Sequence, residues 1–255
     1  MGKRTEDLRI IENKHLGQDF FILELAGSSK ITDFKPGQFV QVKIEGSQDT
    51  FLRRPISIYD IDYERNTFKL FIQIVGKGSA ALSKLKSGDS LNLIYPLGNY
   101  FTLPGEYEKC LLIGGGVGIA PLLFLGKVMN SNGSLPDMLL GFRNSDRIFE
   151  LDKFRKVGNV FITTEDGSAG EKGFVTGHSI LSEKKYDRIY CCGPEPMMKA
   201  VASYCKINSI LCEVSLENLM ACGFGVCLCC IAETVRGNLC SCTDGPIFNV
   251  NDLKW

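Results

Sequence analysis

The chain has 255 residues, 44% of them hydrophobic, and its 29 basic residues balance 29 acidic residues to a formal net charge of zero. This length accommodates one large domain or two ordinary domains with a small extra module, and the balanced charge, with no basic run, argues against a nucleic-acid-binding protein. The chain has eleven cysteines and an N-terminus without a secretion signal, so we expect a cytoplasmic protein whose clustered thiols bind metal or take part in catalysis. The longest apolar run, 111–126, is too short and too rich in glycine to span a membrane.

The first part of the chain consists of short segments with the composition of β-strands. Apolar or alternating runs at 19–26, 38–44, 53–60 and 67–75 are separated by Gly, Pro, Asp and Asn. Several short strands at this close spacing are typical of a barrel or a sandwich. We therefore expect a β domain over residues 1–103.

One of these predicted strands carries a polar pair that suits a phosphate group. Arg54 and Ser57 stand on either side of Pro55 and Ile56, and residues three apart on a twisted strand can both face one ligand. Arginine offers phosphate a charge-assisted pair of hydrogen bonds, and serine adds a hydroxyl. Taken alone, an Arg–Pro pair is more often a strand edge than a binding site.

A glycine turn downstream strengthens the interpretation. Gly76, Gly78 and Ser79 lie just ahead of a short predicted helix at 80–85, and a glycine turn that leads into a helix N-terminus is a typical anion site. The two features together predict a flavin whose pyrophosphate is held by Arg54 and the Gly78–Ser79 turn.

Near residue 105 the pattern changes to apolar strands that alternate with helices. This alternation predicts a parallel α/β domain over residues 104–212. The expected strands are 109–116, 137–142, 159–164 and 187–193, and the expected helices are 119–130 and 194–206.

Three glycine-containing loops follow these strands, at the edge of a parallel sheet where nucleotides bind. The first loop differs from the G-x-G-x-x-G fingerprint, so a tightly packed turn is the alternative interpretation. The third, at 164–176, follows the strand 159–164. The first two loops supply the candidate NAD-binding residues Gly114, Gly115, Gly116, Gly118, Gly193 and Pro194.

Three further side chains near these loops have two interpretations each. Cys192 ends its strand near the expected nicotinamide, so it is a weak candidate for a catalytic thiol, with a buried core thiol as the alternative. Arg143 and Arg147 could meet a 2′-phosphate, which leaves NADP open beside NAD, or could belong to a solvated loop.

The last segment, residues 213–255, contains a cysteine cluster. Cys222, Cys227 and Cys230 have the spacing C-x4-C-x2-C, which with a distant fourth cysteine is the plant-type [2Fe–2S] pattern. Spacing alone does not choose between Cys240 and Cys242 as the fourth ligand. A segment this small is expected to draw stability from a metal centre.

A structural zinc site is the main alternative to the iron–sulfur cluster. Such sites usually use two separated C-x2-C pairs, whereas the second pair here is C-x-C. Cys229 directly precedes Cys230, so their side chains are expected to diverge. The iron–sulfur interpretation is therefore favoured.

These motifs occur in an order that resembles the ferredoxin-reductase superfamily. The run is R-P-I-S-I, G-K-G-S, P-L-G-N, G-G-G-V-G-I-A-P-L, C-G-P-E-P-M and C-G-F-G-V-C-L-C-C…C-T-D-G-P-I-F. With the last motif the chain is similar to the electron-transfer subunits of NAD-linked dihydroorotate dehydrogenases. The resemblance covers nearly the whole chain.

The resemblance implies three domains: an antiparallel FAD-binding barrel at 1–103, an NAD-binding α/β domain at 104–212 and a [2Fe–2S] module at 213–255. It selects Cys242 as the fourth cluster ligand, with Cys222, Cys227 and Cys230, and leaves Cys229 and Cys240 as bystanders. The implied FAD residues are Arg54, Pro55, Ile56, Ser57, Phe71, Ile72, Gln73, Gly78 and Ser79.

The implied activity is electron transfer in pyrimidine biosynthesis. Electrons would pass from an FMN-containing dihydroorotate dehydrogenase catalytic subunit through the cluster and FAD to NAD⁺, within a heterotetramer. The alternative is an NAD(P)H diaphorase subunit of a ferredoxin:NADP or sulfide-type oxidoreductase. In the similar small subunit of the bifurcating ferredoxin:NADP enzymes an Asp typically replaces the first cluster cysteine, so Cys222 favours the dihydroorotate interpretation.

Overall fold

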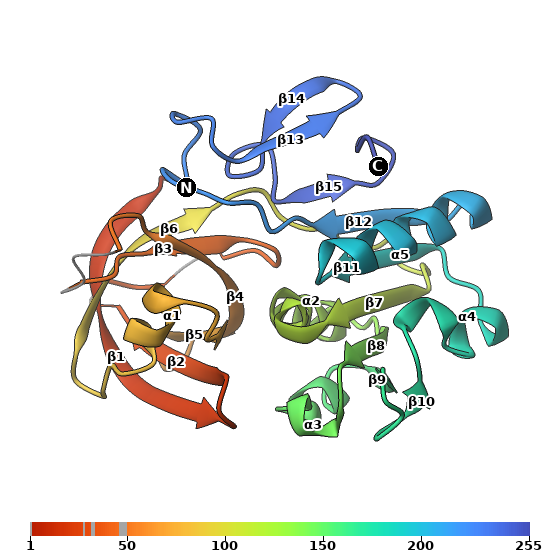
Figure 1. Ribbon diagram of the computed structural model, residues 1–255, viewed down its shortest axis with the longest axis horizontal. Coiled ribbons are helices and arrows are strands. Elements are labelled where there is room, and N and C mark those ends of the chain that lie inside the picture. The colour runs from red at the N-terminus through yellow and green to blue at the C-terminus, as the bar shows by residue number, and fades with distance from the viewer. Residues whose placement is uncertain (1, 28, 32–33, 46–49) are drawn as a thin grey trace.

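An antiparallel β-barrel and a layered α/β domain lie side by side, and a small hairpin sits above the junction between them (Figure 1). The structure is a computed structural model that describes residues 2–27, 29–31, 34–45 and 50–255. Within these residues no helix is both long and apolar enough to cross a membrane. The hairpin consists of β13 (Ile231–Thr234) and β14 (Gly237–Cys240).

The barrel is closed, with the strand order β1-β2-β5-β4-β3-β6, and this confirms the antiparallel barrel. Its interior is filled by alternate residues of each strand, such as Val40 and Val42 of β3. The pattern in the sequence did not predict β1, because only Leu8 and Ile10 of its thirteen residues are buried. The elements are β1 (Arg4–Leu16), β2 (Phe20–Ala26), β3 (Phe39–Val42), β4 (Arg54–Asp62), β5 (Thr67–Gln73), α1 (Lys77–Leu82) and β6 (Ser90–Leu97).

The second domain is built on a seven-stranded sheet with the order β10-β9-β8-β7-β11-β12-β15, parallel throughout except at β15, as predicted for a nucleotide-binding fold. Two predicted strands have the observed bounds, and the two predicted helices correspond to α2 and α5. The elements are β7 (Cys110–Gly115), η1 (Gly116–Ile119), α2 (Ala120–Ser131), β8 (Asp137–Phe142), η2 (Ser145–Arg147), α3 (Leu151–Arg155), β9 (Asn159–Thr164), β10 (Glu171–Lys172), η3 (Val175–Gly177), α4 (Ile180–Glu183), β11 (Arg188–Cys192), α5 (Glu195–Asn208), β12 (Leu211–Ser215) and β15 (Ile247–Asn249).

The C-terminal segment is partly built into this sheet. Its strand β15 pairs antiparallel with β12, and Phe248 and Leu253 are buried in the core of the α/β domain. Strand β12 itself runs across the boundary predicted between residues 212 and 213. The segment therefore has an apolar core in addition to any metal centre, which the sequence pattern did not indicate.

The barrel and the α/β domain share one hydrophobic core. Phe20 and Phe71 of the barrel are buried with Leu122 of α2. On the same interface the Lys127 ammonium lies 2.8 Å from a carboxylate oxygen of Asp60 on β4. This packing fixes the position of the glycine loop after β7 relative to the barrel strands.

Candidate functional site

A cavity of ≈ 640 Å³ opens on the barrel, between β4, β5, the turn before α1 and the segment after β12; we refer to it as the barrel cavity. Its volume lies in the range usual for cofactor sites. All nine residues expected to bind FAD line it, namely Arg54, Pro55, Ile56, Ser57, Phe71, Ile72, Gln73, Gly78 and Ser79.

Arg54 is held at the wall of the barrel cavity by the backbone around it. Its Nη1 donates a 2.7 Å hydrogen bond to the carbonyl oxygen of Leu52. A Cβ atom added to Gly78 would lie only 3.0 Å from Arg54 Nε, so the glycine lets the turn approach the guanidinium. A cationic fork beside a close-approaching backbone turn fits the pyrophosphate of a dinucleotide.

The neighbouring Arg53 binds two strands of the barrel instead of facing the cavity. Its Nη1 donates to the carbonyl oxygens of Gln41 and Asn92 at 3.2 Å, and its Nη2 donates to the Asn92 side chain at 2.5 Å. These bonds tie together strands β3 and β6. Of the two adjacent arginines, only Arg54 is a lining residue of the barrel cavity.

Ser79 shapes the turn that closes this cavity. Its hydroxyl oxygen accepts hydrogen bonds from the backbone N–H groups of Val75 at 2.9 Å and Gly76 at 3.2 Å. The hydroxyl therefore stabilises the start of α1, so turn geometry is one reason for a serine at this position beside the predicted contact with a ligand.

The segment after β12 lines the barrel cavity and was not identified from the sequence. Ser215, Glu217 and Met220 are among its lining residues, and burial raises the pKa of the Glu217 carboxyl. A usable signal was present, because the segment follows the carboxyl end of a strand, where ligands bind open parallel sheets.

A second cavity, of ≈ 460 Å³, lies at the carboxyl ends of β7, β8, β9 and β11; we refer to it as the sheet cavity. Of the six residues expected to bind NAD, Gly115, Gly116 and Pro194 line it. Arg143 and Arg147 line it too, and Arg147 Nη2 also lies 2.8 Å from a carboxylate oxygen of Asp19.

The other three expected residues, Gly114, Gly118 and Gly193, pack behind the sheet cavity. A Cβ atom added to Gly118 would lie 2.5 Å from the carbonyl oxygen of Cys192, and one added to Gly193 would lie 3.0 Å from the backbone nitrogen of Gly115. Gly118 and Gly193 therefore let the loops after β7 and β11 touch, whereas a Cβ atom added to Gly114 would lie 2.9 Å from Ile119 Cγ2.

Cys192 is a core residue in the structure. Its side chain is 1% exposed, it belongs to the core shared by the two domains, and burial raises the pKa of its thiol well above the usual value. It is not a lining residue of either cavity. Such a thiol is chemically inert, which favours the core interpretation over the catalytic one.

The two cavities meet at one side chain. Gln73, the last residue of β5, lines both the barrel cavity and the sheet cavity. The two cavities are therefore adjacent at the end of β5.

The thiols of the predicted cluster cysteines interact with one another in the structure. The Cys222 thiol interacts with Cys227, and the Cys242 thiol interacts with Cys230. Burial opposes ionisation of Cys222, but backbone N–H groups, led by that of Phe224, and the Cys227 thiol together lower its pKa to about 6. The backbone N–H of Gly225 points at Cys242 Sγ, at a distance of 3.2 Å.

The features that suit a [2Fe–2S] cluster are the four cysteines and the backbone N–H groups around them. In the described part of the chain no three Cys, His, Asp or Glu side chains are gathered closely enough to hold one metal ion. A [2Fe–2S] cluster is held by four thiolates shared between two irons, and backbone N–H groups aimed at sulfur are its usual environment.

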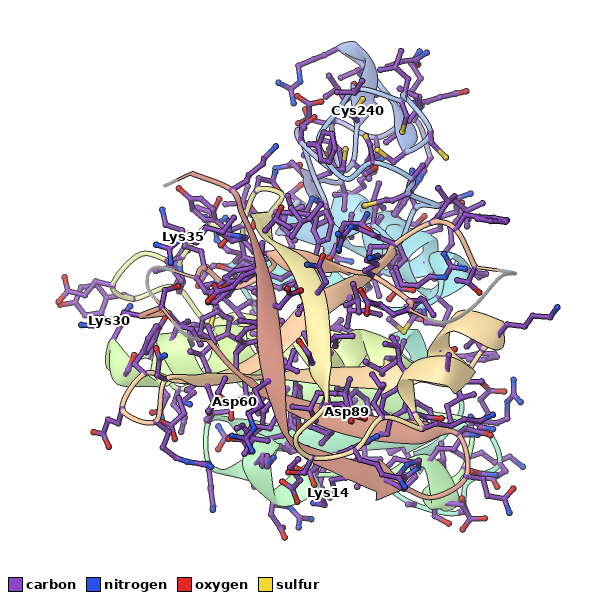
Figure 2. The ribbon with its side chains drawn as sticks, turned by 90° about the vertical axis from the view of Figure 1, so that its left-hand side faces the viewer. Lys14, Lys30, Lys35, Asp60, Asp89 and Cys240 are labelled. Atoms are coloured by element: carbon purple, nitrogen blue, oxygen red, sulfur yellow. The ribbon has the colours of Figure 1, made fainter. Side chains whose placement is uncertain are left out.

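The two cysteines expected to be bystanders differ in environment. Cys229 is exposed, whereas Cys240 is buried at the end of β14 and interacts with Cys230. Figure 2 shows Cys240 in the hairpin module, with further sulfur atoms gathered beside it. Cys240 is thus near the cluster position, but the N–H of Gly225 faces Cys242.

Comparison with protein families divides the chain into three matched regions. Residues 217–254 match the iron–sulfur cluster binding domain of dihydroorotate dehydrogenase B, 112–203 match the oxidoreductase NAD-binding domain, and 7–101 match the oxidoreductase FAD-binding domain. FAD, NAD and an iron–sulfur cluster are therefore the cofactors for which this chain has domains.

Individual proteins are similar over nearly the full length. A protein of Clostridium perfringens, 39% identical with 97% of each chain covered, and one of Fusobacterium nucleatum, 34% identical with 98% of this chain and 99% of the other covered, both carry the name dihydroorotate dehydrogenase B (NAD(+)), electron transfer subunit. The solved structure of an NADH-dependent reduced ferredoxin-NADP oxidoreductase superposes with a TM-score of 0.88 at 30% identity, over 97% of this chain and 90% of that one.

Proposed function

Because the chain belongs to the family of dihydroorotate dehydrogenase B (NAD(+)) electron transfer subunits, we propose that it receives its electrons from a separate FMN-containing dihydroorotate dehydrogenase catalytic subunit. The chain is a flavin and iron–sulfur oxidoreductase subunit that transfers electrons to NAD⁺, and the name of its relatives implies a catalytic partner. A cytoplasmic heterotetramer with two copies of each subunit is the assembly we infer from the resemblance.

One observation carries the proposal: the barrel cavity lies between the sheet cavity and the cysteines. Gln73 lines both cavities, and Met220 lines the barrel cavity while it packs with Cys230. Bound FAD exchanges a hydride with NAD and single electrons with an iron–sulfur cluster, so it belongs between the two. The order of the sites matches that requirement.

The roles of individual residues follow from this order. We propose that Arg54 and the Gly78–Ser79 turn bind the pyrophosphate of FAD and that Phe71 and Ile72 contact its flavin. Gly115, Gly116 and Pro194 would face NAD. Cys222, Cys227, Cys230 and Cys242 would hold the cluster.

The surface beside the cysteines suits a partner that delivers electrons there. We refer to residues 221–230 as the cysteine segment. Leu219 flanks this segment, and Val226 and Leu228 lie within it; their side chains are 86%, 75% and 61% exposed. An apolar rim around an exposed thiol, Cys227, is typical of an interface rather than of free surface. We propose that the FMN subunit docks on this rim.

A pair of cysteine variants tests the proposal in the complex with the FMN subunit. Cys227→Ser removes a proposed cluster ligand, whereas Cys229→Ser removes its exposed neighbour and serves as the matched control. We expect Cys227→Ser to abolish dihydroorotate-driven NAD⁺ reduction but to retain NADH oxidation with an artificial dye, because that reaction needs only the barrel and sheet cavities. Cys229→Ser should retain both activities.

Two outcomes would contradict the proposal. If the wild-type complex does not reduce NAD⁺ with dihydroorotate but does so with reduced ferredoxin, the partner is wrong. If Cys227→Ser keeps the dihydroorotate-driven reaction, electrons do not pass through a cluster held by Cys227.

A further inference from the structure

One glutamine of the barrel, Gln41, has a buried side-chain amide without a hydrogen-bond partner among the described residues. The Gln41 side chain is fully buried, and neither its Oε1 nor its Nε2 has a hydrogen-bond partner among the described residues. Its backbone lies inside the ladders that β3 forms with β4 and β6, so the strand position is fixed. Buried amides are nearly always hydrogen-bonded, because leaving one unpaired costs free energy.

The amide is directed out of the barrel, toward the cysteine segment. Alternate residues of β3 face opposite sides, so Val40 and Val42 fill the barrel while Phe39 and Gln41 face outward. Phe39 packs there with Cys230 and Cys242. Gln41 is the only polar side chain on this outer face of β3.

Contacts with a glycine place the amide beside the first cluster cysteine. A Cβ atom added to Gly223 would lie 2.7 Å from Gln41 Cγ and 3.0 Å from its Nε2. Gly223 directly follows Cys222 and has a positive φ of 80°, so the chain turns there around the glutamine. Any larger residue would displace the amide from this position.

We propose that Gln41 is a positioning and tuning residue for the cluster, whose Nε2 donates a hydrogen bond to a cluster sulfur on the Cys222 side. The inference rests on the proposed cluster ligands, because cluster sulfurs would supply the acceptor that this buried donor lacks. N–H donors to sulfur stabilise the reduced, more negative form of an iron–sulfur cluster and so raise its reduction potential.

The position of Gln41 also links the cluster to the flavin site. In the pairing of β3 with β4, Gln41 stands opposite Pro55, one of the residues that line the barrel cavity. The same strand pair thus carries a lining residue of the barrel cavity and the donor to the cluster. Tuning by Gln41 would set the driving force of the electron step between the two cofactors.

The test is a redox titration of the cluster, followed by electron paramagnetic resonance, in the complex loaded with FAD. Gln41→Met keeps the length of the side chain but removes the donor. At a fixed ambient potential we expect the ratio of reduced to oxidised cluster to fall by about tenfold, a shift of about 59 mV for a one-electron couple. Gln41→His, which keeps an N–H donor, should restore part of the shift.

A matched control distinguishes this effect from damage to the barrel. The amide of Gln38 is already used, because its Nε2 donates to Gly98 and its Oε1 accepts from the Lys35 backbone. Gln38→Met should lower stability and leave the cluster potential unchanged. An equal shift in both variants would overturn the proposal, because it would reflect a general loosening.

A measurement on the wild-type protein covers the case in which Gln41→Met does not fold. With ¹⁵N-labelled glutamine side chains, pulsed electron paramagnetic resonance of the reduced cluster should show coupling to one amide nitrogen. No coupling, or an unchanged potential in an iron-replete Gln41→Met complex, would overturn the inference alone. A wild-type chain without iron would instead overturn the proposed function.

Discussion

The barrel cavity and the cysteine segment are both proposed to hold a redox group, but they differ in how their backbone is ordered. Seven of the nine expected FAD residues stand on strands β4 and β5, whose registers are fixed by neighbours on both sides. Residues 217–230 contain no strand or helix, and the backbone takes positive φ at Gly223, Gly225 and Leu228. The positions on β4 and β5 are therefore fixed by the fold, whereas we expect the cysteine segment to take much of its order from what it binds.

The largest expected effect comes from the choice of the fourth ligand. Cys242→Ser should abolish cluster assembly, because each thiolate of a [2Fe–2S] cluster is one of only four. Cys240→Ser, two residues away and also buried, should retain the cluster. Iron and acid-labile sulfide per chain give the readout, and an iron-free Cys240→Ser protein beside an iron-replete Cys242→Ser protein would reverse the assignment.

The fold could be predicted from the sequence where a run of apolar residues marks a strand. Strand β8, which is almost continuously buried, and strand β9, with its apolar stretch 160–162, have the predicted bounds. Strand β1, with two buried residues, and β15, with three residues in all, carry too little pattern to be recognised. Their pairing is decided by tertiary contacts, which no local pattern contains.

Residues of the candidate site could be predicted from the sequence only where they belong to a recognisable motif. The nine expected FAD residues came from motifs and family resemblance, and all line one cavity. Glu217 and Gln41 carry no motif. Gln41 reads as an ordinary strand residue until the outer face of β3 is known to meet the cysteine segment, which depends on contacts between parts of the chain nearly two hundred residues apart.

The two adjacent arginines of the barrel are expected to have separate roles. Arg54→Ala should weaken FAD binding about 10- to 100-fold, because it removes charge-assisted hydrogen bonds to phosphate. Arg53→Ala should instead lower the melting temperature, since Arg53 ties β3 to β6. FAD titration by fluorescence quenching and a thermal melt measure the two effects. Weaker FAD binding in Arg53→Ala alone would show that the roles are exchanged.

Removing the cluster should make the cysteine segment more mobile and leave the barrel strands unchanged. After chelation of iron, we expect amide exchange in residues 221–230 to quicken at least tenfold, because the bound group supplies the order there. Amides of β4 and β5 should keep their protection, since the barrel ladders do not depend on the cysteines. Hydrogen exchange with mass spectrometry measures both regions, and equally faster exchange in both would mean that the barrel also depends on the cluster.

The smallest effect is expected at Asp137, the first residue of β8, which lies at the amino end of that strand and not at the carboxyl end that faces the sheet cavity. Burial alone would raise the pKa of its carboxyl, but hydrogen bonds from Lys184 at 2.7 Å, Asn159 at 2.9 Å and Tyr186 at 2.7 Å outweigh it and hold the pKa below the usual value. We expect Asp137→Asn to lower the free energy of unfolding by about 2 kcal/mol at pH 7, with FAD and iron content unchanged.

The pH dependence of this effect has a defined sign. A carboxyl whose folded-state pKa lies below the unfolded value of about 3.9 stabilises the fold fully above that pH, and the stabilisation is lost as the pH falls through the folded-state pKa. The difference between wild type and Asp137→Asn in urea unfolding should therefore shrink below about pH 4. Asp152→Asn is the control, because the Asp152 side chain is 89% exposed and its ion pair with Arg155 should contribute less than about 0.5 kcal/mol. A constant difference down to pH 3 would mean that packing, and not the ionised carboxylate, makes Asp137 stabilising.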